Sequence, residues 1–235
     1  RYDETDSQRF GLTGSPVRAR FQAQSVESGQ PAPLALDADA GGNLSVLDGH
    51  DSRVVAFSVT GQSRILGAAP ADALDLSAGD AGEVYLTTRA GLLQRLGLGL
   101  GPATDWSVPC HCDLGGRVTS NDLAVYVSQP RTGEVGVFST DDGQRLRPYK
   151  LPDGAGLWPA DVATGAGGLL YTADMISAQV QAWRRAESPD GVWQAGLLGG
   201  PRRVATGHWD GQDLVAALLA DGYVELHDAR SGRLL

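Results

Sequence analysis

The densest group of potential metal ligands in this 235-residue chain is Cys110-His111-Cys112-Asp113. Thiolates and an imidazole suit zinc or copper, but a structural zinc site needs four ligands, which usually come from two separated pairs. The chain has no second cysteine pair, and its other histidines are scattered. The C-x-C spacing is awkward for an intramolecular disulfide, although it does not forbid one. The residues therefore favour an ordinary turn, with Cys110, His111 and Cys112 as weak metal candidates.

A second group of residues with chemical potential lies in or beside short polar loops. Loops on a rigid scaffold commonly carry binding sites. Met175 and Ile176 offer an apolar contact, and Arg89 and Arg131 can pair with acidic groups. The candidate binding residues are His50, Asp51, Ser52, Arg89, Arg131, Trp158, Met175 and Ile176. For each one alone, a solvated turn (or core packing, for Trp158) is the simpler interpretation.

The sequence gives no sign of catalytic machinery. It contains no G-x-S-x-G, Walker or zincin motif. A Ser-His-Asp triad is defined by geometry and cannot be read from spacing. Asp48 and Asp174 occupy equivalent positions in a repeat, so we expect them to bond to nearby backbone in turns rather than to catalyse a reaction. No catalytic residue is predicted.

The elements that position these loops are predicted hairpins. Residues 42–57, GNLSVLDGHDSRVVAF, carry two alternating apolar runs on either side of the polar loop 49–52. Alternation with period two around a short polar loop is typical of a hairpin with one buried face. Residues 168–183 match this stretch without a gap, so that Asp48 aligns with Asp174 and Phe57 with Trp183.

The hairpin recurs along most of the chain. Its last bulky residue is found at intervals of 39, 42, 45 and 44, at Phe57, Leu96, Phe138, Trp183 and His227. A period of roughly 40–45 residues belongs to β-propellers and related arrays with four strands per blade. Further short strands precede and follow each hairpin, and no segment has a helical apolar period. The chain is therefore predicted to be all-β, a β-propeller of four-stranded blades, with five blades first and six second.

Composition sets broad limits. Hydrophobic residues make up 42% of the chain and charged residues 20%, which is an ordinary globular balance. The 32 glycines and 12 prolines suit many short strands joined by turns. A net charge of −9 argues against binding to a nucleic-acid backbone. No apolar run has the length of a membrane-spanning helix.

Individual repeats resemble known propeller families. Residues 33–62 resemble an NHL repeat in Asp37, Gly42-Asn43, Asp48, Phe57 and Gly61. Residues 124–144 look like the bacterial YVTN repeat, and residues 214–235 are similar to a WD40 blade ending, with His227 where that family usually has Trp. The resemblance covers roughly 31–235 and implies a propeller, but these folds host many unrelated functions.

The first 30 residues stand apart as an N-terminal lead, and 31–235 is predicted to be the propeller. Residues 17–24, VRARFQAQ, alternate like one strand, and the last unit ends as its outer strand begins at Arg233. A propeller that does not close leaves exposed strand edges. We therefore expect residues 17–24 to complete the last blade's sheet. The alternative is an incomplete ring continued by another chain or by residues outside this sequence.

The function expected from these patterns is a non-enzymatic protein-binding or assembly module, for example a component of a bacterial secreted, surface or phage-tail-like complex. One alternative is a propeller enzyme with a central metal, of the lactonase or lyase sort. Another is a small-ligand sensor domain. No cofactor is predicted, although the residues leave open a calcium or zinc ion in the channel. An extracytoplasmic location is slightly favoured.

Overall fold

The computed structural model describes residues 32–79, 82–97, 104–150, 158–184, 192–197 and 199–235. These residues form 19 β-strands and a single three-residue 3-10 turn, η1 (Ala166–Gly168). None of their helical structure is long and apolar enough to cross a membrane. The N-terminal lead and its expected strand, 17–24, lie outside the described residues, so their role in closing a ring stays a prediction.

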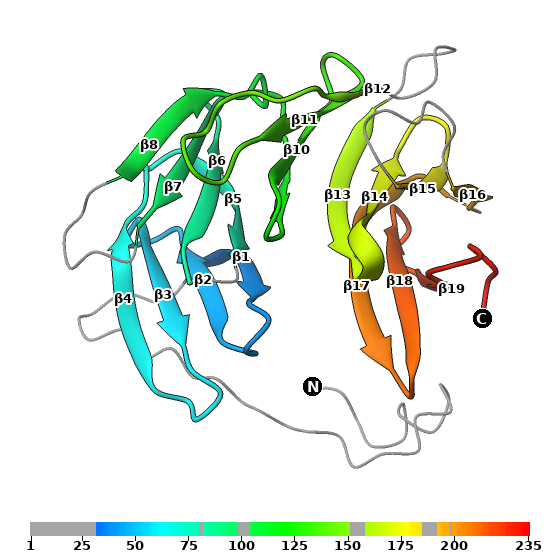
Figure 1. Ribbon diagram of the computed structural model, residues 1–235, viewed down its shortest axis with the longest axis horizontal. Helices are drawn as coiled ribbons and strands as arrows, with labels where there is room; N and C mark the ends of the chain where they lie inside the picture. Colours follow the sequence, from blue (N-terminus) through cyan, green and yellow to red (C-terminus); the bar gives the residue numbers. More distant parts are fainter. Residues whose placement is uncertain (1–31, 80–81, 98–103, 151–157, 185–191, 198) are drawn as a thin grey trace.

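The strands form five antiparallel sheets, which we number as blades 1 to 5 (Figure 1). Blade 1 contains β1 (Pro33–Ala38), β2 (Leu44–Asp48), β3 (Arg53–Phe57) and β4 (Ser63–Ala68). Blade 2 contains β5 (Ala73–Ala78), β6 (Val84–Thr88), β7 (Leu92–Leu96) and β8 (Thr104–Pro109). Blade 3 contains β9 (Val118–Ser120), β10 (Val125–Gln129), β11 (Glu134–Phe138) and β12 (Tyr149–Lys150).

Blade 4 contains β13 (Pro159–Gly165), β14 (Leu169–Asp174), β15 (Gln179–Trp183) and β16 (Trp193–Gly196). Blade 5 contains β17 (Pro201–Trp209), β18 (Gln212–Leu219) and β19 (Val224–Asp228). Its fourth strand is represented by a single bridge between His227 and Leu234. In every blade the strands follow one another in chain order from the innermost to the outermost.

The blades are arranged around an axis, with the innermost strand of each beside that of the next (Figure 1). The predicted all-β propeller with five blades is therefore confirmed. The predicted hairpin is also confirmed, because Leu44 pairs with Phe57 and Asp48 with Arg53. In its second copy, Leu170 pairs with Trp183 and Asp174 with Gln179, so the two hairpins share one register.

The core lies between successive sheets. Leu47 and Val54 of blade 1 pack against Leu76 and Leu86 of blade 2, and the same kind of buried cluster joins each later pair of blades. Period-two alternation explains this arrangement, since it gives each sheet two apolar faces, one for each neighbour. Each interior blade is therefore held by the hydrophobic effect on both faces.

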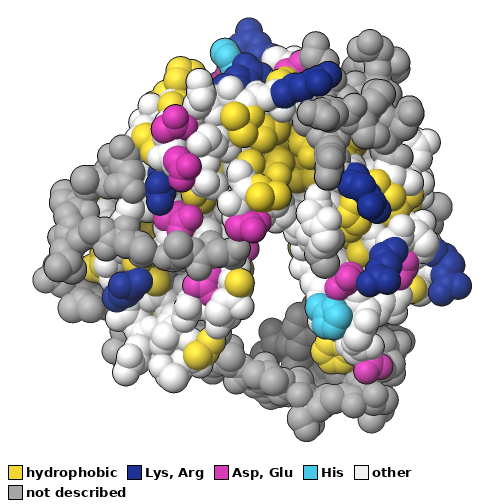
Figure 2. Space-filling model, in the orientation of Figure 1, with side chains coloured by type: hydrophobic (Ala, Val, Ile, Leu, Met, Phe, Trp, Pro, Cys, Tyr) yellow, Lys and Arg dark blue, Asp and Glu magenta, His cyan; other side chains and the backbone are white. Residues whose placement is uncertain are grey.

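The first and last blades differ from the interior ones, because one apolar face of each is solvent-exposed. In blade 1, Leu36 is 64% exposed and Ile65 is 61% exposed. In blade 5, Val224 is 57% exposed and Leu226 is 42% exposed. Within the described residues no contact comparable to those between neighbouring inner strands joins β17 to β1, and an opening separates the two blades (Figure 2). Within the described residues, the five blades therefore form an arc whose first and last members do not meet.

Candidate functional site

The innermost strands of all five blades line a central channel of about 850 Å³. In blades 1, 2, 4 and 5 the inner strand contains a register shift near its start. The residue at this shift, which pairs with the penultimate residue of the next strand, is Asp75 in blade 2, Asp161 in blade 4 and Arg203 in blade 5. Arg117 stands at the same point of blade 3, and Ala35 in blade 1. Charges of opposite sign thus alternate along the channel wall from blade 2 to blade 5.

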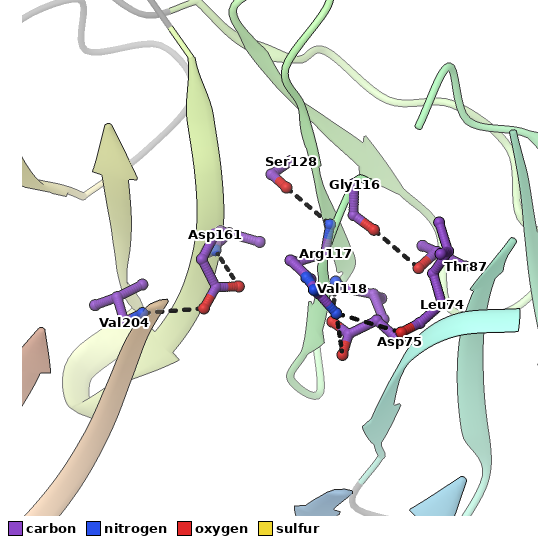
Figure 3. A network of polar contacts seen from close by, with 10 residues as sticks. Leu74, Asp75, Thr87, Gly116, Arg117, Val118, Ser128, Asp161 and Val204 are labelled. Carbon is purple, nitrogen blue, oxygen red and sulfur yellow. Dashed lines mark hydrogen bonds and ion pairs between the residues drawn. The ribbon is translucent and has the colours of Figure 1, made fainter. Parts of the chain in front are cut away.

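The two aspartates bind the backbone of the following blade (Figure 3). The N–H of Val118 donates to Asp75 Oδ2 over 3.1 Å, and the N–H of Val204 donates to Asp161 Oδ2 over 2.9 Å. Arg117 completes the first of these contacts. Its Nη1 lies 3.4 Å from Asp75 Oδ1 and donates to the carbonyl oxygen of Leu74 over 3.2 Å. Each aspartate therefore links its blade to the next one.

Burial changes the acidity of these carboxyl groups. It is the largest influence on Asp75, whose pKa is raised although the Arg117 charge and the Val118 N–H oppose the rise. Burial also raises the pKa of Asp161 to about 7; the nearby Asp75 charge adds to the rise, and the Val204 N–H and Arg203 oppose it. A carboxyl group that titrates near neutral pH is common at functional sites. Here both Asp161 oxygens accept backbone N–H groups, so its demonstrable task is structural.

A second polar row crosses all five inner strands. Asp37 Oδ2 accepts hydrogen bonds from the Ala78 N–H and the Ser77 hydroxyl, and Ser77 contacts Ser120 hydroxyl to hydroxyl. The row continues because the Thr164 hydroxyl donates to the Ser120 carbonyl and the Thr206 hydroxyl to the Thr164 carbonyl. The channel wall is therefore a continuous hydrogen-bonded lining that ends at Asp37 on one side and at Thr206 on the other.

The channel offers little to a metal ion. Across the described strands and loops, no group of three or more His, Cys, Asp or Glu side chains is arranged to hold one. The two most buried channel carboxylates, Asp75 and Asp161, already accept backbone N–H groups. The described side chains therefore form no acidic, histidine or cysteine cluster that would fit the calcium or zinc ion left open by the sequence.

The eight candidate binding residues all lie at one end of the blades. Seven of them belong to loops between the second and third strands, and these loops share a face because all blades run in the same sense around the axis. Trp158 joins this face, since its N–H donates to Asp174 and its carbonyl oxygen accepts from Met175. The structure spreads these residues over the ends of blades 1 to 4. Their role in binding stays a prediction.

Within this face, several expectations for single residues can be checked. Asp48 Oδ1 accepts the His50 N–H over 3.0 Å, and Asp174 Oδ1 accepts those of Ile176 and Ser177 over 3.0 and 2.7 Å. The predicted turn-forming role of both aspartates is therefore confirmed. Arg131 forms an exposed ion pair with Asp113, with 3.2 Å between Nη1 and Oδ2.

The cysteines differ from expectation, because Cys110 and Cys112 form a disulfide. His111 between them adopts a positive φ of 55°, which closes the short loop and leaves its side chain exposed. Both cysteines are fully buried between blades 2 and 3. A disulfide sulfur is not a thiolate ligand. The interpretation of this segment as an ordinary turn with free thiols, or as a weak metal site, is thus replaced by a covalent link within the turn.

Sequence reasoning missed the charged row Asp75, Arg117, Asp161 and Arg203. The signal was present, because each residue directly precedes the buried apolar residue of its inner strand: Leu76, Val118, Val162 and Val204. Aligning the inner strands on that apolar residue, rather than the hairpins on their last bulky residue, places the four charges in one column. The register shift at Asp75, Asp161 and Arg203 is not visible in the sequence.

The arrangement can now be compared with known proteins. Neither a protein-family model nor a curated protein sequence matches the chain. Among solved structures it is similar to selenomethionine-substituted virginiamycin B lyase from Staphylococcus aureus, with a TM-score of 0.60, 16% identity and coverage of 84% of this chain and 70% of the lyase. A catalytically inactive variant of that lyase with quinupristin gives a TM-score of 0.59 at the same identity and coverage. These likenesses establish the fold.

A structure of streptogramin B lyase is also similar, with a TM-score of 0.52, 10% identity and coverage of 86% of this chain and 85% of the lyase. All three identities are low, so the comparison supports the β-propeller and carries no activity over to this chain.

Proposed function

We propose that this chain is a non-enzymatic protein-binding module that assembles with a partner through the open ends of its propeller. The observation that carries the proposal is the exposed apolar face on each terminal blade. Leu36 and Leu76 occupy equivalent positions, yet Leu36 is 64% exposed in blade 1 whereas Leu76 is 3% exposed in blade 2. Contiguous exposed apolar surface on a folded protein is a mark of interaction sites.

The open faces are continuous across their sheets. In blade 1, Leu36 lies opposite Val46, Val46 opposite Val55, and Val55 opposite Ile65, so one apolar row crosses all four strands. In blade 5, Leu218 lies opposite Val224 and Ala216 opposite Leu226. Residues directly opposite one another share a face. Apolar faces of this kind join the interior blades to one another, so the two open faces suit another β-sheet.

The disulfide supports an extracytoplasmic setting for this assembly, because disulfides persist mainly in oxidising compartments. A bacterial secreted, surface or phage-tail-like complex is such a setting. We include in the proposal the relation of single repeats to the NHL, YVTN and WD40 families, which commonly serve as binding platforms. The polar loop face with His50, Arg131 and Met175 would be a second contact area on the same scaffold.

A second candidate is a propeller enzyme of the lyase or lactonase sort, or a small-ligand sensor, with its site in the channel. The observation in its favour is Asp161, whose raised pKa of about 7 suits proton transfer near neutral pH. Turnover or tight binding of a small molecule that is lost in Asp161→Asn, with the fold intact, would favour this candidate.

The main proposal is tested by affinity capture from the native source with three forms of the chain: wild type, a double variant and a control variant. The double variant Leu36→Arg, Leu226→Arg places a charge on each open face at exposed positions, so its fold is expected to survive. A matched variant, Leu123→Arg, charges an exposed residue in the turn between β9 and β10 of interior blade 3. A partner held by wild type and by the Leu123 variant but lost by the double variant supports the proposal. The absence of any stable partner, or its retention by all three forms, contradicts it.

A further inference from the structure

Blade 2 contacts blade 3 in the same way that blade 4 contacts blade 5. Blades 2 and 4 carry an aspartate on the inner strand, Asp75 and Asp161, which accepts a backbone N–H from the next blade. They also carry a tryptophan on the outermost strand, Trp106 in β8 and Trp193 in β16. Blades 2 and 4 place the aspartate and the tryptophan against the blade that follows, and we call them donor blades. The name refers to these two side chains and not to hydrogen-bond donation.

The two tryptophans share an aromatic neighbour and a glycine neighbour. Trp106 lies 5.9 Å from Tyr85, ring centroid to ring centroid, and Trp193 lies 5.8 Å from Tyr171. Each indole covers a glycine in the turn before the outermost strand of the next blade. A Cβ built on Gly143 would come within 2.7 Å of Trp106, and one built on Gly232 within 2.5 Å of Trp193. Blades 3 and 5, which receive the indole on this glycine, are acceptor blades.

Blade 1 has the characteristics of an acceptor blade. Its turn between β3 and β4 contains Gly61, whose φ of +82° matches the +71° of Gly143 and the +70° of Gly232. The turn is closed by the same pair of groups, the N–H of Ser58 and the carbonyl of Gln62, as the N–H of Ser139 and the carbonyl of Gln144 close it in blade 3. The turn of blade 1 is one residue shorter.

Among the described residues, blade 1 has no donor. A Cβ built on Gly61 would meet nothing within 4 Å, so no indole covers this turn. All five tryptophans lie at position 106 or beyond, and residues 1–31 contain none. A second copy of the chain would offer blade 5 as its free end, but that blade carries Arg203 where a donor blade carries aspartate. Residues 1–31 thus contain no indole, and the described part of blade 5 lacks the donor groups that a second copy would have to supply.

We propose that the open face of blade 1 is a docking site for a donor blade carried by a partner polypeptide. The partner's donor blade has a tryptophan on its outermost strand, and this tryptophan covers Gly61. It also has an aspartate on its innermost strand, which accepts the Leu36 N–H as Asp75 accepts that of Val118. Its apolar face covers the row from Leu36 to Ile65. Because acceptor and donor blades alternate, one such blade also satisfies the open face of blade 5. The inference rests on the proposed binding function and specifies the partner.

The test closes the arc with a blade of known type. Leu234 and Leu235 pair with β19 as Arg145 and Leu146 pair with β11, so a residue added after Leu235 corresponds to Arg147. The chain is therefore extended by a copy of residues 147–197, which contains donor blade 4. We expect a rise in Tm of about 4 °C or more and at least a two-fold loss of binding of an apolar fluorescent dye. Replacing the copied Trp193 and Asp161 by alanine removes most of both effects.

A second extension distinguishes this inference from the broader proposal. It joins a copy of 147–157 to a copy of 114–150, which contains acceptor blade 3. An acceptor extension that raises Tm and reduces dye binding as much as the donor extension overturns the inference but leaves the binding function standing. If neither extension changes Tm or dye binding, both fail. An extension that limited proteolysis removes, leaving the Tm of the original chain, also counts against the inference.

The substitution Gly61→Ala supplies an independent readout. In the original chain it adds a methyl group into open space, whereas in the extended chain that methyl group meets the copied indole. We therefore expect Gly61→Ala to lower Tm several degrees more in the donor-extended chain than in the original chain. An equal effect in both chains means that no indole covers Gly61 and overturns the proposal.

Discussion

Replacing Gly143 by alanine should destabilise the propeller for two separate reasons. The first is backbone strain, because Gly143 has a φ of +71° and an alanine in the left-handed region costs roughly 1–2 kcal/mol. The second is a clash, since the added Cβ would lie 2.7 Å from Trp106 Cε3 and 2.9 Å from its Cδ2. Overpacking of this kind costs about 1–3 kcal/mol. The total loss in the free energy of unfolding is about 2–5 kcal/mol.

Gly61→Ala is the matched control, because it shares the strain and lacks the clash. Its φ is +82° and its new Cβ would meet nothing within 4 Å, so it should cost only the roughly 1–2 kcal/mol of strain. Urea denaturation followed by circular dichroism measures both variants against wild type. Gly232→Ala, which meets Trp193, should behave like Gly143→Ala. Equal losses in the free energy of unfolding for Gly61→Ala and Gly143→Ala would refute the claim that blade 1 is an acceptor blade whose glycine no indole covers.

Three further outcomes are expected. The folded-state pKa of Asp161 is raised from 3.8 to about 7, so the stability it contributes is complete below pH 4 and is lost as pH rises to about 7. This loss in the free energy of unfolding is on the order of 4 kcal/mol, and urea titrations at successive pH values measure it. Asp161→Asn should flatten the dependence of the free energy of unfolding on pH, and an unchanged dependence contradicts the burial argument. Leu36→Ala should change stability by less than about 0.5 kcal/mol, whereas Leu76→Ala at the equivalent buried position should cost about 2–5 kcal/mol; similar values would show that the blade 1 face is covered. Replacing Cys110 and Cys112 by serine should cost about 1.5 kcal/mol in thermal unfolding, because the closed loop is short, and no loss would mean that the disulfide does not stabilise the fold.

The repeat could be predicted from sequence because it depends on local chemistry. Period-two alternation places Leu47 and Val54 on one face of their hairpin and Phe57 on the other, and the same pattern returns in each blade. Asp48 and Asp174 could be assigned to turns because their bonds reach only two or three residues along the chain. Such short-range features are carried by a single hairpin and do not require knowledge of the other blades.

The channel and the open faces could not be predicted in the same way. The bond from Asp75 to Val118 spans 43 positions and depends on how one blade sits on the next. Whether Leu36 is covered depends on a neighbour, and its own sequence context is the same as that of a buried residue such as Leu76. The disulfide between Cys110 and Cys112 required the positive φ of His111, which residue type alone does not indicate.

Hydrogen–deuterium exchange on the chain extended by residues 147–197 tests the central claim most directly. If the open faces are the binding surface, closing the arc should slow exchange in the peptides of blade 1 and blade 5, including β3, β4 and β19. Exchange in blade 3, whose two faces are already covered, should stay the same. Unchanged exchange in blades 1 and 5, or new protection confined to the loop face around His50 and Arg131, would contradict the account.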